Sequence, residues 1–200
     1  MPSTTSTRWL WVDLETTGLG HDPAEPQTNR DDVILEVAAL VTDGELNILG
    51  SFGPAAVRAS QADLALMDDY VRDMHTSTGL LERVTGPDAL PIEQVDELMS
   101  AWLQTHGLAE KVILAGSSVK LDQEFIRRHM PDTYRHLHYR VIDVSSFKEA
   151  LRAWAPDVVA ERENAPMEGT KHQAMDDIRA SVAELAHYRQ ALGLPSPDRH

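Results

Sequence analysis

The chain has 200 residues, of which 42% are hydrophobic and 25% charged, as expected for one globular domain with a sizeable core. No cysteine is present, which excludes disulfides, thiolate metal sites and thiol nucleophiles. No apolar stretch approaches the roughly 20 residues that span a bilayer, so we expect no membrane partner. The polar start of the chain lacks the pattern of a secretion signal, and we expect a cytoplasmic protein.

The charge balance limits the kind of nucleic acid that the chain can bind. Its 32 acidic residues face 18 lysines and arginines, for a net charge of −14. Proteins that hold long nucleic acids usually present a basic stripe that displaces counterions from phosphates. Either the substrate is not a polyanion, or it is a very short one held by metals and a few specific contacts. An acidic surface also serves solubility alone.

Alternating side chains in the first quarter of the chain predict an antiparallel meander. Residues 9–15 alternate apolar and polar positions, which indicates a strand. Residues 20–32 are rich in Asp, Pro and Asn and predict a loop. Residues 33–42 form an apolar strand with one embedded acid, Glu36, and a turn at Asp43 leads to a third strand over 46–52.

After residue 60 the pattern changes to helices that alternate with short strands. Helical spacing covers 61–70, 92–105, 121–129 and 146–154, and short strands are predicted at 111–115 and 140–144. Residues 155–170 predict a polar loop with two prolines. A long terminal helix carries one apolar stripe, formed by Met175, Ile178, Val182 and Leu185.

These elements predict an α/β fold class with a mixed five-stranded sheet, an antiparallel meander plus parallel strands, flanked by helices. We expect a single domain over 9–192, with flexible tails at 1–8 and 193–200. Ligands of such sheets bind at strand ends near the point where the strand order reverses. Acidic residues at those ends are therefore the first candidates for a site.

Asp13 and Glu15 lie at the end of the first predicted strand. Residues two apart on a strand project from the same face, so the two carboxylates are neighbours. Adjacent carboxylates on a core-bearing strand are costly unless a cation lies between them, and oxygen ligands suit Mg²⁺ or Mn²⁺. The alternative is that the strand has ended and water solvates both acids.

Two later acids have similar ambiguity. Asp122 follows a buried strand and begins a helix, where it is either a site residue or an acid favoured by the helix dipole. His172 and Asp177 are five residues apart, about 140° on a helix, and cannot share one helical face. We therefore expect His172 in the preceding loop and Asp177 beside Ile178 of the buried stripe. Ordinary capping is the alternative for this segment.

Taken together, these segments resemble a known family. Asp13-Leu14-Glu15-Thr16-Thr17-Gly18-Leu19, Asp122 and His172-Gln173-Ala174-Met175-Asp176-Asp177 are similar to the three motifs of the DEDDh exonucleases, which have the ribonuclease H-like fold. Further strings, among them Ala65-Leu66-Met67-Asp68-Asp69 and His138-Tyr139-Arg140, resemble the oligoribonucleases within that family. The resemblance extends from about Trp9 to Arg189.

The resemblance implies a 3′-to-5′ exoribonuclease that degrades short RNA, especially dinucleotides, to nucleoside 5′-monophosphates. It implies that two divalent metal ions, Mg²⁺ or Mn²⁺, are held by four carboxylates and that His172 is the general base. The implied metal ligands are Asp13, Glu15, Asp122 and Asp177. A homodimer is also implied.

The same resemblance implies roles in substrate binding. Leu19 would be an apolar wedge between two bases, and Tyr70 stands where the family usually has a stacking tryptophan. Tyr139 would reach into the partner's site in the homodimer. The 5′ phosphate would be capped by Ser118, Arg140 and Ser145, with His75 nearby. Each of these has an ordinary surface or core role as its alternative, and the segment 20–32 is longer than in the family.

Two other functions remain compatible with the sequence. One is a DEDDh exonuclease that acts on DNA or on structured RNA 3′ ends, which would need a longer basic path than this chain offers. The other is a non-catalytic nucleotide-binding module on the same fold. Retention of all five expected polar residues counts against the second, since a binding module has no use for a complete metal site.

Overall fold

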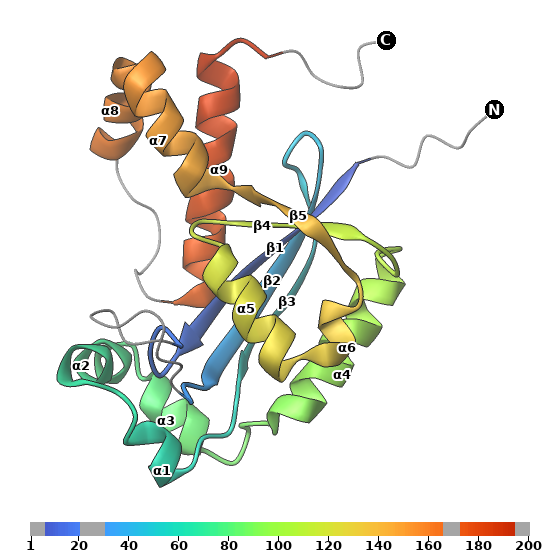
Figure 1. Cartoon of the computed structure of the whole chain (residues 1–200), viewed down its shortest axis with the longest axis vertical. Coiled ribbons are helices and arrows are strands. Elements are labelled where there is room, and N and C mark those ends of the chain that lie inside the picture. Colours follow the sequence, from blue (N-terminus) through green and yellow to red (C-terminus); the bar gives the residue numbers. More distant parts are fainter. Residues whose placement is uncertain (1–6, 21–30, 166–172, 195–200) are drawn as a thin grey trace.

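A mixed five-stranded sheet lies at the centre of the computed structural model, which describes residues 7–20, 31–165 and 173–194 (Figure 1). The strand order is β3-β2-β1-β4-β5. β1 pairs antiparallel with β2 and parallel with β4, β2 pairs antiparallel with β3, and β4 pairs parallel with β5. The strands are β1 Arg8–Thr16, β2 Ile34–Asp43, β3 Ile48–Ala56, β4 Val112–Gly116 and β5 Leu137–Asp143. The predicted meander followed by parallel strands is confirmed.

Helices cover both faces of the sheet and one end of it (Figure 1). One face packs against α4 Ile92–Thr105 and α5 Lys120–His129, which is followed by α6 Pro131–Tyr134. The other face packs against α7 Val144–Trp154, α8 Pro156–Asn164 and α9 Ala174–Ala191. Beside the carboxyl end of β1 lie α1 Gln61–Leu64, α2 Asp69–Ser77 and α3 Leu80–Thr85. None of the described helices is both long and apolar enough to cross a membrane.

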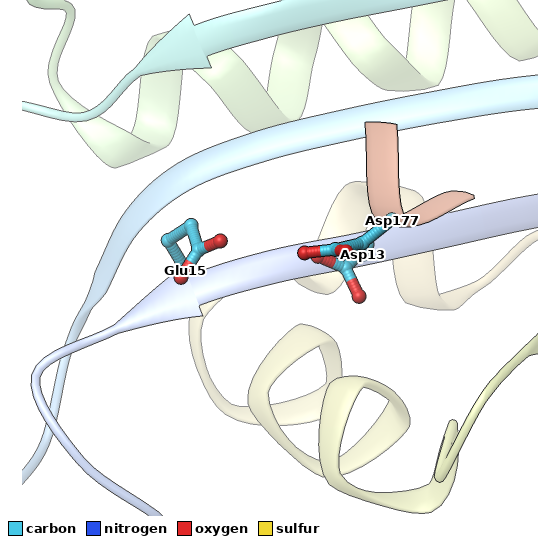
Figure 2. A group of neighbouring side chains, drawn as sticks. All are labelled: Asp13, Glu15 and Asp177. Atoms are coloured by element: carbon cyan, nitrogen blue, oxygen red, sulfur yellow. The ribbon is translucent and has the colours of Figure 1, made fainter. Parts of the chain in front are cut away.

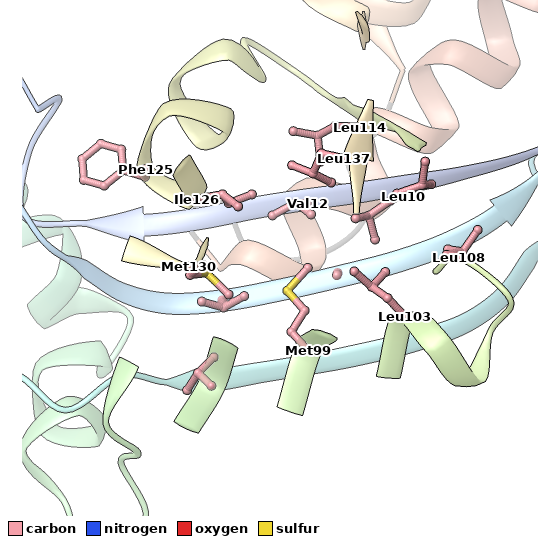
Figure 3. Packing of buried hydrophobic residues seen from close by; sticks show 14 of the residues in the cluster. Leu10, Val12, Met99, Leu103, Leu108, Leu114, Phe125, Ile126, Met130 and Leu137 are labelled. Carbon is pink, nitrogen blue, oxygen red and sulfur yellow. The ribbon is translucent and has the colours of Figure 1, made fainter. Parts of the chain in front are cut away.

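Alternation along β1 decides which side of the sheet carries the polar residues. Leu10 and Val12 are buried in the core beneath α4 and α5, together with Met99 and Phe125 (Figure 3). Trp11 is buried in the opposite core, beneath α7 to α9. Because side chains alternate on a strand, the odd-numbered acids that follow Trp11 project toward the α9 side.

Two expectations about helices were wrong. Residues 155–170 include α8, which begins at Pro156 and buries Val159. Proline is tolerated in the first helical turn because the amide that it lacks would be unpaired there anyway. The single helix expected over 61–70 is divided between α1 and α2. The division occurs because the Asp68 side chain accepts a hydrogen bond from Val71 N at 2.8 Å and starts a new helix.

The limits of the domain stay a prediction, since most of the predicted tails lies outside the described residues. β1 begins at Arg8, one residue before the expected start, and α9 ends at Ala191. Most of the predicted loop 20–32, and His172, also lie outside the described residues.

Candidate active site

Three carboxylates from two distant segments meet at the end of β1. Asp13, Glu15 and Asp177 each present an oxygen that lies within 4.8 Å of the other two (Figure 2). Glu15 is buried, whereas Asp13 and Asp177 are partly exposed. An all-oxygen set of this kind suits a hard divalent cation such as Mg²⁺ or Mn²⁺.

The first turn of α9 carries the third carboxylate into the cluster. The helix packs on the sheet through its apolar stripe, with Ile178 and Val182 buried and Met175 and Leu185 partly buried, as predicted. Asp176 and Asp177 are both half-buried, but only Asp177 joins the cluster. The position next to Ile178 therefore selects the carboxylate that meets β1.

Asp122 lies beside this cluster, in the first turn of α5, and is buried. Its Oδ1 accepts a hydrogen bond from Leu14 N at 3.1 Å, which links α5 to β1 between the two acidic residues of the strand. Asp122 is not one of the three residues whose oxygens converge, yet its charge raises the pKa of both Asp13 and Glu15. It is thus a fourth carboxylate next to the cluster, held on the backbone of β1.

Burial and mutual repulsion perturb the protonation of these acids. Burial, followed by the charges of Asp122, Glu15 and Asp177, raises the pKa of Asp13 to about 9. Burial, followed by the charge of Asp177, raises the pKa of Glu15 to about 7. Burial likewise raises the pKa of Asp122 to about 7, against the hydrogen bond from Leu14. Without cations the site favours protons, so its residues fit a group that brings positive charge.

A second layer of charged side chains supports Glu15 from behind. Glu36, on β2, is the residue paired with Glu15 across the strands and is buried. Arg83 Nη2 donates a hydrogen bond of 2.6 Å to Glu36 Oε1, and the arginine charge lowers the pKa of Glu15. Sequence reasoning missed Arg83, although the acid embedded in the apolar run 33–42 was a signal that a cation must lie nearby.

His75 also lies behind Glu15 and is fully buried. Its Nε2 lies 2.9 Å from the Thr16 carbonyl, and because a carbonyl can only accept, Nε2 carries a proton. The other ring nitrogen, Nδ1, lies 3.8 Å from Glu15 Oε2. The structure therefore places His75 against the carboxyl end of β1.

A cavity of about 300 Å³ opens next to the carboxylate cluster and shares Glu15 with it. Leu19 and Tyr70 line this cavity together, although 51 residues separate them in the sequence. Both remain accessible, with 47% of Leu19 and 71% of Tyr70 exposed. The cavity thus offers two apolar surfaces to a flat ligand beside the acidic cluster.

Ser118 and Ser145 meet at the carboxyl ends of the parallel strands β4 and β5. Their hydroxyl oxygens are 3.4 Å apart, and both backbone amides donate to Oδ1 of Asp143 at 3.0 Å. Tyr139 and Arg140 lie on β5, the edge strand, and both are exposed. The Arg140 guanidinium lies 5.3 Å from the centre of the Tyr139 ring, within cation–π range.

Comparisons with known proteins identify the family. The RNase T family model, described as an exonuclease, matches residues 10–185. The oligoribonuclease of Corynebacterium diphtheriae is 42% identical over 95% of this chain and 85% of its own length. The oligoribonuclease of Vibrio campbellii is 39% identical over 92% of this chain and 94% of its own length.

Solved structures share the fold at low sequence identity. Exonuclease I from Methylocaldum szegediense has a TM-score of 0.67 and 18% identity, and covers 94% of this chain. The match spans about two fifths of that longer protein, 41% of its chain. The zinc-bound form of the Escherichia coli ExoI–ssDNA complex has a TM-score of 0.66 at 17% identity. With a ribonuclease H-like exonuclease fold and these relatives, the chain belongs to the oligoribonuclease family of 3′-to-5′ exoribonucleases.

Proposed function

We propose that the enzyme removes nucleotides from the 3′ end of very short RNA, with dinucleotides as its main substrate. The observation that carries this proposal is the cavity between Leu19 and Tyr70, which opens onto the carboxylate cluster through Glu15. A cavity of about 300 Å³ is of a size to hold the end of an RNA strand. The net charge of −14 agrees with a substrate that has few phosphates, because little counterion release is then available.

Asp13, Glu15, Asp122 and Asp177 would hold two divalent ions, Mg²⁺ or Mn²⁺. When bound, these ions supply positive charge at the scissile phosphate and increase the acidity of a water molecule. The raised pKa values of three of these acids support the assignment, because closely spaced carboxylates that favour protons would also favour divalent cations. Family similarity and the carboxylate cluster support divalent metal use in general.

His172 would accept the proton of the attacking water. The water oxygen then bonds to phosphorus, the bond to the 3′ oxygen breaks, and a nucleoside 5′-monophosphate is released. The ordinary pKa of histidine, roughly 6.5, suits a base that works near neutral pH. α9 begins at Ala174, two residues after His172, which agrees with a base located before the helix that carries Asp177.

Leu19 would separate the two bases of a dinucleotide and Tyr70 would stack on one of them. Ser118, Ser145 and Arg140 would hold the 5′ phosphate, Arg140 through its bidentate guanidinium. The two serines meet at the carboxyl ends of β4 and β5, where ligands of α/β sheets commonly bind. His75 would affect substrate binding from behind Glu15 and not by direct contact, because its side chain is fully buried.

The enzyme would act as a homodimer in the cytoplasm. Tyr139 supports this arrangement, because 76% of its surface is exposed on the edge strand β5. A large aromatic side chain exposed in this way is available to a partner subunit, whose site it would complete. Sedimentation at several protein concentrations, for wild type and Tyr139→Ala, measures whether a dimer forms and whether this residue contributes to it.

One experiment tests the reaction. The 5′-labelled di- and heptaribonucleotide, and the corresponding deoxydinucleotide, are incubated with the protein in EDTA, Mg²⁺ or Mn²⁺. We expect metal-dependent cleavage that is fastest on the diribonucleotide. Faster cleavage of the deoxydinucleotide would favour a DNA exonuclease, and no turnover with either metal would refute catalysis.

A variant tests the base. His172→Asn should lower kcat by about 10²- to 10⁴-fold, the range typical of a lost general base. Wild-type turnover at saturating metal in this variant would show that another group takes the proton.

A further inference from the structure

The buried carboxylate of Asp32 lies outside the catalytic site and has no part in the proposed mechanism. We propose that Asp32 is a positioning residue that fixes Leu19 as a wedge and thereby sets the preference for dinucleotides. This inference rests on the proposed function, in which Leu19 separates two bases.

Asp32 holds the residues on both sides of Leu19. Its Oδ1 accepts a hydrogen bond from Thr17 Oγ1 at 3.1 Å, and its Oδ2 accepts one from Gly20 N at 3.0 Å. The two donors stand two residues before and one residue after Leu19. The carboxylate therefore closes the turn that carries Leu19, with one oxygen bound at each end.

Backbone contacts make this connection rigid. Thr17 N donates to the Val33 carbonyl at 3.0 Å, and Val33 N donates to Thr17 Oγ1 at 3.0 Å. Gly18 allows the close approach, since a Cβ at this position would lie 2.7 Å from both carboxylate oxygens of Asp32. Only glycine can bring its backbone this near to the carboxylate without displacement.

The burial pattern of the turn is that of a rigid base with an exposed tip. Asp32 is 1% exposed and Thr17 is fully buried, whereas Leu19 between the bound ends is 47% exposed and lines the cavity beside Glu15. An exposed leucine on a mobile loop would lose side-chain and backbone freedom when it separates two bases. Held by Asp32, it is already in position before the substrate binds.

A buried carboxylate is costly, and its retention here calls for a reason. Burying a charged group lowers stability unless hydrogen bonds compensate, and apolar replacements of buried charges are often as stable or more so. The turn has two donors, on Thr17 and Gly20, which precede Asp32 by 15 and 12 residues in the sequence. A carboxylate at position 32 supplies one acceptor oxygen to each of them. Through its hydrogen bond with Gly20 N, Asp32 joins the two ends of the segment between Gly20 and Asp32.

A double-mutant cycle separates positioning of Leu19 from a general structural role. The full-length Asp32→Ala, Leu19→Ala and double variants are compared with wild type by steady-state kinetics on 5′-labelled di- and heptaribonucleotides in Mg²⁺. Asp31→Ala is the matched control, because Asp31 is the exposed neighbour and the variant loses the same charge. Melting temperatures of all variants define an assay temperature at which each one is folded.

We expect Asp32→Ala to raise KM for the dinucleotide about tenfold with a smaller effect on kcat, as for the loss of hydrogen bonds to a charged acceptor. Asp31→Ala should stay within about twofold of wild type, a surface change of little energetic effect. In the Leu19→Ala variant, the additional change Asp32→Ala should raise KM for the dinucleotide little further. Asp32→Asn, which retains an acceptor for Gly20 N, should recover most of the affinity.

Three results overturn the inference, two by refuting positioning and one by refuting the wedge. If Asp32→Ala raises KM by the same factor in wild type and in the Leu19→Ala variant, Asp32 does not act through Leu19. If Asp32→Ala leaves KM unchanged while Leu19→Ala raises it, Asp32 does not position the leucine. Either result would refute positioning and leave the wedge itself in place. An unchanged KM in Leu19→Ala alone would refute the wedge, and with it both this inference and that part of the proposed function.

Discussion

The raised pKa of Asp13 makes the metal-free protein less stable at alkaline pH. In the native state this carboxyl has a pKa of about 9, because of its burial and the neighbouring charges of Asp122, Glu15 and Asp177. In the unfolded chain its pKa is about 3.9. Between these values the native state carries a proton that the unfolded state lacks, so the free energy of unfolding falls as pH rises.

The size of the effect follows from proton linkage. From pH 7 to pH 9 a single group with these pKa values lowers the free energy of unfolding by about 2 kcal/mol. For a chain of this length, that corresponds to a fall of about 4–8 °C in the melting temperature. Asp13→Asn removes the titrating group. From pH 7 to pH 9 the free energy of unfolding of this variant should therefore fall by about 2 kcal/mol less than that of wild type.

Thermal unfolding in EDTA at pH 7, 8 and 9 measures this difference. Wild type, Asp13→Asn and the control Asp31→Asn are compared, because the control makes the same carboxyl-to-amide change at an exposed position. Addition of Mg²⁺ or Mn²⁺ should stabilise wild type most at pH 9, the tested pH at which protons compete least with the cations. Parallel pH profiles for wild type and Asp13→Asn would refute the reasoning, because Asp13 would then be ionised in the native state.

Three further experiments test other parts of the site. Asp177→Asn should lower kcat on the order of a hundredfold or more. Asp176→Asn, which changes the neighbour outside the cluster, should keep kcat within about tenfold of wild type. Similar losses of kcat in both variants would contradict the selection of Asp177. Arg140→Ala should raise KM for the dinucleotide by roughly tenfold, and much less for a heptamer; an equal loss on both lengths would speak against a phosphate cap. Gly18→Ala should destabilise the fold by about 1–3 kcal/mol, because its Cβ would meet the Asp32 carboxylate at 2.7 Å; an unchanged melting temperature would show that the turn can relax.

Periodicity was sufficient to predict most of the sheet but not the elements that proline or capping residues control. The strands over 9–15 and 33–42 were predicted because their alternating or continuous apolar patterns reflect burial directly. α8 was missed because Pro156 was interpreted as a loop residue, whereas it occupies the first helical turn. The break before α2 depends on one side-chain hydrogen bond from Asp68, which spacing alone does not indicate.

Prediction of the site depended on local geometry and failed for tertiary contacts. A separation of two residues on a strand was enough to place Asp13 and Glu15 on one face, and the apolar stripe of α9 was enough to favour Asp177 over Asp176. The position of Arg83 behind Glu36 depends on how α3 packs against β2, which no local pattern contains. His172 stays a prediction, since it lies outside the described residues.

The location of two clustered carboxylates, Asp13 and Glu15, on the central strand restricts how this protein can change in evolution. β1 pairs with β2 from Arg8 to Thr16 and with β4 over residues 9–11, so both neighbours fix its register before Asp13. Deleting one residue between 9 and 12 would turn Asp13 and Glu15 toward the apolar layer of Met99 and Phe125 and would bring Leu14 and Thr16 into their places. Insertions and deletions should therefore be absent from this strand in active relatives, whereas the segment between Gly20 and Asp32 is free to vary in length.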